Sequence, residues 1–117
     1  MAYDPENIFA RILRDEIPST RVYEDDEFVA IRDVAPAAPT HILVLPRHEG
    51  VTGPADLEQA DAPWVGRMVV VATQVAREQG LDADGYRLVM NWGRDAGQTV
   101  PHLHLHILGG RPMLGLA

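Results

Sequence analysis

The chain has 117 residues, 46% of them hydrophobic, and a formal net charge of −7 at pH 7. This length and apolar content suit one domain with a substantial core, so we expect a single domain over residues 1–117. The acidic balance disfavours nucleic-acid binding, and no apolar run approaches the roughly 18 residues that cross a membrane. The chain lacks cysteine, which excludes disulfides and thiolate metal sites, and its N-terminus does not resemble a signal peptide. We therefore expect a cytoplasmic protein that binds neither nucleic acid nor membranes.

The first expected element is a short helix near the N-terminus. Asp4 is a suitable N-cap and Pro5 fits a first helical turn. Pro18 prevents continuation of the helix. The helix should bury one apolar stripe, formed by Ile8, Phe9, Ile12 and Leu13.

Three strands are expected next, over residues 22–24, 28–33 and 41–45, with Pro46 ending the third. The strongest helix signal follows at 63–79, where Asp61 can cap the start and Gly80 can end the helix. Its apolar positions, which favour core packing over a subunit interface, are Val65, Met68, Val69, Ala72, Val75 and Ala76.

Two further strands are expected at 86–91 and 102–108, separated by a loop over 93–101. The order of helix, strands, helix and strands favours an α+β fold, with an antiparallel sheet covered by helices on one face.

The most informative stretch is His102-Leu103-His104-Leu105-His106. On a strand, period-2 spacing places all three imidazoles on one face and the apolar residues on the other. Histidine titrates near neutral pH, which suits it to nucleophilic and proton-transfer chemistry. Three of the five histidines of the chain lie in this pentapeptide, so we interpret it as a functional face.

Two chemistries could use this face. Imidazoles two residues apart can converge on a metal ion, but no carboxylate lies on the strand to complete a ligand set. Alternatively, one histidine attacks phosphorus to form a covalent nucleotidyl-enzyme while its neighbours handle protons. Gln98 and Thr99 precede the strand and could donate to phosphate oxygens, and Gly97 lets the backbone approach a ligand.

The pattern His-φ-His-φ-His-φ-φ over residues 102–108 resembles the signature of the histidine triad (HIT) superfamily. Residues 7–18, 23–26, 33–41, 45–48, 86–91 and 97–102 further resemble the histidine triad nucleotide-binding (Hint) branch. This resemblance implies a HIT-like α+β fold: a five-stranded antiparallel sheet with two main helices, the sheet continuing across a homodimer through the 86–91 region.

The resemblance also implies roles for individual residues. His104 would be the nucleophile, His106 would bond phosphate oxygens, and His41 would support and orient His104. Thr99, where the family often has serine, would lie next to the leaving group, and His102 completes the expected catalytic set. The expected nucleotide-binding residues are Asp33 for the ribose hydroxyls, Ile8, Phe9, Ile12, Ile31 and Leu43 around the purine base, and Asn91, Gly97 and Gln98 near the phosphate or ribose.

The implied activity is cleavage of the P–N bond of purine nucleoside 5′-phosphoramidates, with no cofactor and no metal. Three alternatives stay open: hydrolysis of dinucleoside polyphosphates, nucleotide binding with weak turnover, and a metal-dependent enzyme. One departure from the family bears on the leaving group, because the C-terminal segment 111–117 is short and carries no aromatic residue.

Overall fold

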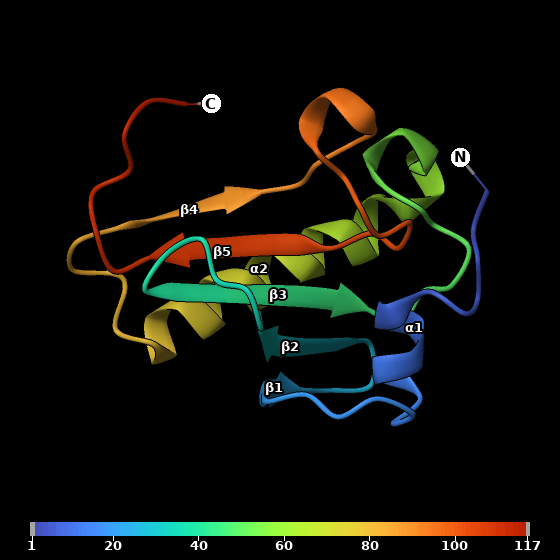
Figure 1. The fold of residues 1–117 in the computed structure, drawn as a ribbon, viewed down its shortest axis with the longest axis horizontal. Helices are drawn as coiled ribbons and strands as arrows, with labels where there is room; N and C mark the ends of the chain where they lie inside the picture. Colours follow the sequence, from blue (N-terminus) through green and yellow to red (C-terminus); the bar gives the residue numbers. More distant parts are fainter. Residues whose placement is uncertain (1, 117) are drawn as a thin grey trace.

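The computed structural model describes residues 2–116, and its centre is a five-stranded antiparallel sheet in the order β1-β2-β3-β5-β4. Figure 1 shows the sheet with β1 at the bottom and β4 at the top. The strands are β1 (Arg21–Glu24), β2 (Phe28–Arg32), β3 (Thr40–Pro46), β4 (Tyr86–Val89) and β5 (Leu105–Gly109). Strands β2, β3 and β5 therefore occupy the interior, and β1 and β4 form the edges.

Helix α2 (Ala62–Glu78) covers one face of the sheet and passes behind it in Figure 1. Asp61 precedes the helix, but its carboxylate accepts hydrogen bonds from Glu58 N and the Trp64 indole rather than capping α2. Gly80, with φ of +76°, follows the helix in the left-handed conformation that favours glycine. The buried side chains of α2 are Trp64, Met68, Val71, Ala72, Val75 and Ala76.

Of the expected α2 stripe, Val69 lies outside the core, and Val65 packs against the core without being fully buried. Val69 is 38% exposed and Val65 is partly buried, whereas Trp64 and Val71 are buried in their place. The apolar face of the helix is thus rotated slightly from the predicted one. Apolar periodicity alone did not show this, because residues 68–72 contain consecutive valines that fit several stripes.

Helix α1 (Ile8–Leu13) lies on the opposite side of the sheet, at the right-hand end in Figure 1. The expectation that both helices cover one face is therefore wrong. A separate core cluster joins α1 to β2 and β3 through Phe9, Ile12, Val29, Ile31, Leu43 and Leu45. These strands are apolar on both faces, so each face needs its own cover.

The first helix begins later than predicted. Asn7, not Asp4, is the N-cap, and its side-chain oxygen accepts from Ala10 N at 2.9 Å. Asp4 instead stabilises the preceding turn, where its carboxylate accepts from Glu6 N and its carbonyl accepts from Asn7 N. Both residues are good caps, and the helix begins at the one that lies closer to the apolar stripe.

The histidine strand and β4 are shorter than predicted. Residues 102–104 precede β5 without strand pairing, because His102 N donates to Val100 O in a tight turn and Leu103 N donates to Val51 O. Strand β4 ends at Val89 rather than at 91. Within the described chain, no helix combines the length and apolar character needed to span a membrane.

Candidate active site

One ring nitrogen of His104 has a free lone pair, because the other ring nitrogen is hydrogen-bonded to the backbone of His102. Its Nδ1 lies 2.7 Å from the carbonyl oxygen of His102, which can only accept, so Nδ1 carries the proton. The neutral ring then has an unprotonated Nε2. The ring is 8% exposed and packs edge-on against Phe9, with the two ring centres 4.9 Å apart. The backbone thus leaves the lone pair on Nε2 of His104 available.

His106 presents the complementary group, a hydrogen-bond donor. Its Nδ1 is 2.9 Å from Nε2 of His41, and Nδ1 of His41 accepts from the backbone N–H of Ala37 at 2.9 Å. A neutral His41 must therefore carry its proton on Nε2 and donate it to His106 Nδ1. His106 in turn carries its proton on Nε2, which is buried and has no hydrogen-bond partner. An unpaired buried donor beside a nucleophile is suited to a phosphate oxygen.

Strand register explains why these rings meet. Leu43 of β3 lies opposite His106 of β5, and His41 is two residues before Leu43 on the same face. His41 and His106 are thus diagonal neighbours, with ring centres 5.2 Å apart, and the rings of His104 and His106 are 4.9 Å apart. The direct hydrogen-bond partner of His41 is His106, whereas the family resemblance implied that His41 would support and orient His104.

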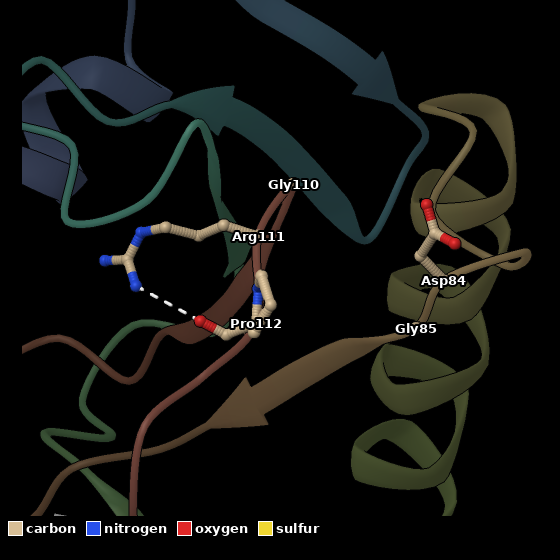
Figure 2. Close-up of a pocket in the computed structure, with 5 residues that line it drawn as sticks. All are labelled: Asp84, Gly85, Gly110, Arg111 and Pro112. Carbon is tan, nitrogen blue, oxygen red and sulfur yellow. Dashed lines mark hydrogen bonds between the residues drawn. The ribbon is translucent and has the colours of Figure 1, made fainter.

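The segment after β5 supports the loop that holds His41. Arg111 Nη2 donates to the carbonyl of Ala37 at 2.8 Å, the same residue whose N–H fixes the His41 tautomer. Gly110 has φ of +94°, and a Cβ there would lie 2.8 Å from Pro39 Cβ, so only glycine permits this close approach. Figure 2 shows Gly110 and Arg111 in a pocket with Asp84, from which the Arg111 side chain extends away.

Burial keeps His41 and the three histidines of the triad, at 102, 104 and 106, neutral near pH 7. Desolvation lowers the pKa of His41, His102 and His104 below the ordinary 6.5. The pKa of His106 falls to about 4, first through burial and then through the neighbouring rings of His104 and His41. Asp33, whose Oδ2 lies 3.4 Å from His41 Nε2, opposes the lowering of the pKa of His41, His104 and His106 without reversing it.

His102 does not belong to the reactive face, contrary to expectation. It is fully buried, its Nε2 lies 2.9 Å from the carbonyl of Pro46, and its Nδ1 lies 2.9 Å from the Tyr3 hydroxyl. Both nitrogens are therefore engaged. The ring still lies near the Phe9 ring that packs on His104, with centres 6.4 Å apart, but neither of its nitrogens is free for a substrate.

Gln98 has no free donor for a phosphate, which departs from the expected role. Its side-chain nitrogen donates to Thr52 O at 2.6 Å and to Val100 O at 3.1 Å, and its side-chain oxygen accepts from Gly93 N at 2.9 Å. Its backbone N–H donates to Gly93 O. Gln98 instead ties the loop before the triad to the loop after β3. A sequence cannot distinguish these uses of one amide.

The residues expected around a purine base fall into two groups. Phe9, Ile12, Ile31 and Leu43 are buried in the cluster between α1 and the sheet, whereas Ile8 is 47% exposed. Asp33 follows β2 and borders a surface pocket lined by Pro18, Ser19, Thr20, Arg32 and Val34. Thr99 and Gly97 are exposed on the loop before the triad, and Asn91 is partly buried after β4.

Asp33, His41 and His106 also form a group of potential metal ligands, with donor atoms within 4.8 Å of one another. Their hydrogen bonds do not suit a metal. His41 directs a protonated Nε2 at the group, because its Nδ1 accepts from Ala37. Two nitrogens on one tetrahedral zinc ion would lie roughly 3.3 Å apart, whereas His41 and His106 are at the hydrogen-bond distance of 2.9 Å. His41 and His106 are thus hydrogen-bonded to each other rather than arranged as metal ligands.

Three residues that shape the site were not identified from sequence. Tyr3 bonds the first histidine of the triad, Ala37 contributes a backbone N–H, and Arg111 contacts that residue from the far end of the chain. Tyr3 and Arg111 are distant in sequence from the residues that they contact, and an alanine has no side chain that could mark its role.

Comparisons with known proteins agree with this geometry. Residues 14–113 match the family model of the HIT domain. The chain is 50% identical over 110 residues to a purine nucleoside phosphoramidase of Escherichia coli (strain K12), covering 92% of this chain and 90% of that protein. It is 48% identical over 111 residues to a 14 kDa zinc-binding protein of Zea mays, covering 94% and 86%. A HIT family hydrolase from Clostridium thermocellum superposes with a TM-score of 0.90 at 39% identity, covering 95% of this chain and 96% of that one.

Proposed function

The chain belongs to the HIT domain family, and on that premise we propose that it hydrolyses the P–N bond of purine nucleoside 5′-phosphoramidates through a nucleotidyl-histidine intermediate. The observation that carries the proposal is the pairing of His104 and His106. One ring offers an unprotonated Nε2, and the adjacent ring offers an unpartnered Nε2–H. A phosphoryl centre needs both, a nucleophile for phosphorus and a donor for its oxygens.

The reaction proceeds in two steps. Nε2 of His104 attacks the phosphorus atom and forms a P–N bond, while the bond from phosphorus to the amine breaks. The departing amine keeps the electron pair and takes a proton, for which the Thr99 hydroxyl is the proposed donor. Water then attacks the phosphorus of the nucleotidyl-histidine and the bond from phosphorus to Nε2 breaks. The proton that the water loses returns to the Thr99 oxygen, so that the nucleoside monophosphate is released and both Thr99 and His104 are restored.

The remaining residues bind and orient the substrate. We assign the ribose hydroxyls to Asp33, whose Oδ1 is held by Ala35 N at 2.8 Å while Oδ2 faces His41. His41 fixes the donor tautomer of His106. The apolar wall for the base is assigned to Ile8, Phe9, Ile12, Ile31 and Leu43, and the phosphate-side backbone to Asn91 and Gly97.

A homodimer and a cytoplasmic location stay predictions. The edge strand β4 supports the dimer, because its four residues are all partly exposed and one side of the strand has no partner in the sheet. A second copy could pair there and continue the sheet. Light scattering at micromolar concentration checks this, with a dimer mass expected.

The direct test of the activity is release of AMP from adenosine 5′-phosphoramidate by the native chain and by His104→Ala, with a chelator present. We expect release that the substitution abolishes while AMP binding is retained. A diadenosine polyphosphate assayed in parallel measures the alternative activity, and faster turnover of that substrate would replace the proposed one. Loss of native activity on chelation would instead support a metal-dependent enzyme.

A further inference from the structure

The N-terminal segment makes a specific contact with the first triad histidine across 99 positions of sequence. The Tyr3 hydroxyl lies 2.9 Å from Nδ1 of His102, and the two rings are tilted together with centres 5.7 Å apart. Asn7, the buried cap of α1, holds this segment in place by donating from its side chain to the Asp4 carbonyl at 2.7 Å. Tyr3 is thus presented to His102 by an ordered turn.

The direction of this hydrogen bond follows from the partners. The Pro46 carbonyl can only accept, so Nε2 of His102 carries the proton and Nδ1 must accept from the Tyr3 hydroxyl. Burial also raises the pKa of Tyr3, so the phenol keeps the proton that it donates. His102 is fully buried, and without Tyr3 its Nδ1 would be an unsatisfied acceptor.

His102 is also the residue whose carbonyl holds the nucleophile. That oxygen receives Nδ1–H of His104 at 2.7 Å, so any shift in the His102 backbone changes the tautomer and aim of His104. The ring of His102 is fixed at one nitrogen by Pro46 and at the other by Tyr3. A residue outside the reactive face therefore controls the group that attacks phosphorus.

We propose that Tyr3 is a positioning residue for the nucleophile: its hydroxyl holds the His102 ring in place through Nδ1, and the His102 carbonyl thereby positions His104. The kinetic consequence rests on the proposed phosphoramidase activity. The structural consequence, which is the position of the His102 ring and the hydrogen bond from His104 to the His102 carbonyl, does not depend on that activity.

The test is Tyr3→Phe, which removes one oxygen atom, with Tyr23→Phe as the matched control. Tyr23 lies on β1 and donates its hydroxyl to Asp25, outside the triad. Two readouts are needed: steady-state kinetics on adenosine 5′-phosphoramidate, and long-range ¹H–¹⁵N spectra that distinguish protonated from unprotonated ring nitrogens. Circular dichroism at the assay temperature confirms that each variant is folded.

For Tyr3→Phe we expect kcat to fall about tenfold, the effect of one lost buried hydrogen bond, with KM changed less than about twofold. The ring nitrogens of His102 and Nδ1 of His104 should shift in the same variant. Tyr23→Phe should match the native chain in both readouts. A native kcat in Tyr3→Phe, or a reduced kcat with unshifted histidine nitrogens, overturns the proposal.

The spectra separate this proposal from the proposed function. If the native chain does not turn over the phosphoramidate, the assigned activity fails. The ¹⁵N signals of Tyr3→Phe then still decide whether Tyr3 holds His102, and native-like signals reject the contact itself.

Discussion

Protonation of the triad should destabilise the fold, and His106 allows the size of the effect to be worked out. Its pKa falls from 6.5 to about 4 on folding. A folded-state pKa below the unfolded value means that the unfolded chain binds more protons in acid, so stability falls as the pH drops below about 6.5. Between pH 7 and pH 5 the linkage relation gives a loss of about 2 kcal/mol for a fully buried group, and about 1–2 kcal/mol after allowance for partial solvent contact.

The perturbation is His106→Asn, whose side-chain oxygen can still accept from Nε2–H of His41 but cannot take up a proton in this range. The assay is urea-induced unfolding at intervals from pH 7 to pH 5, a window above the normal pKa of carboxylates. Both proteins should lose stability, because burial also lowers the pKa of His41, His102 and His104. The loss in His106→Asn should be smaller by about 1–2 kcal/mol.

A matched control is His48→Asn. His48 lies outside the triad, where it stacks on Trp64 with ring centres 4.1 Å apart and contacts Glu27 at 3.1 Å, so this variant removes a histidine without altering the triad. Equal pH dependence in His106→Asn and the native chain would refute the argument that burial keeps His106 neutral.

Three further outcomes follow from the loops around the site. Gly110→Ala should lower the free energy of unfolding by about 1–3 kcal/mol more than Gly50→Ala, as measured by denaturant unfolding, because both have φ near +94° but only Gly110 meets Pro39. Gln98→Glu should cost about 1–3 kcal/mol and lower Tm, since it places a carboxylate against two carbonyl oxygens, whereas Gln79→Glu keeps an acceptor for Arg32 and should be near neutral. A chelator should leave the rate of AMP release unchanged in a dialysis-controlled assay, and a dependence on added zinc would contradict the metal-free assignment of His41 and His106.

The elements that could be predicted from sequence are those whose local pattern of residues fits only one type of secondary structure. A short apolar run ended by Pro46 identified β3, and the 3.6-residue period with Gly80 identified the length of α2. The family motifs led to the HIT fold, which the HIT-domain match and the similar solved structures confirm. Each of these signals lies within a short segment, so one sequence is enough to read it.

Features that depend on tertiary partners could not be predicted. The period of the histidine segment suggested three equivalent rings, but the turn at Val100 and the bond to Val51 separate His102 from the others. The same limit applies to Gln98, whose amide is used by three backbone groups of the surrounding loops. To assign such hydrogen bonds, one must know which distant segments of the chain lie close together, and the periodicity of a sequence does not give this information.

The central claim is that His104 becomes covalently nucleotidylated, and trapping that species tests it most directly. The native chain is mixed with adenosine 5′-phosphoramidate in the presence of chelator, quenched within one turnover, and its intact and peptide masses are measured. The account predicts a mass gain of one adenylyl group located on His104, lost on longer incubation and absent in His104→Ala. AMP release without any adduct, or an adduct on another residue, would contradict it.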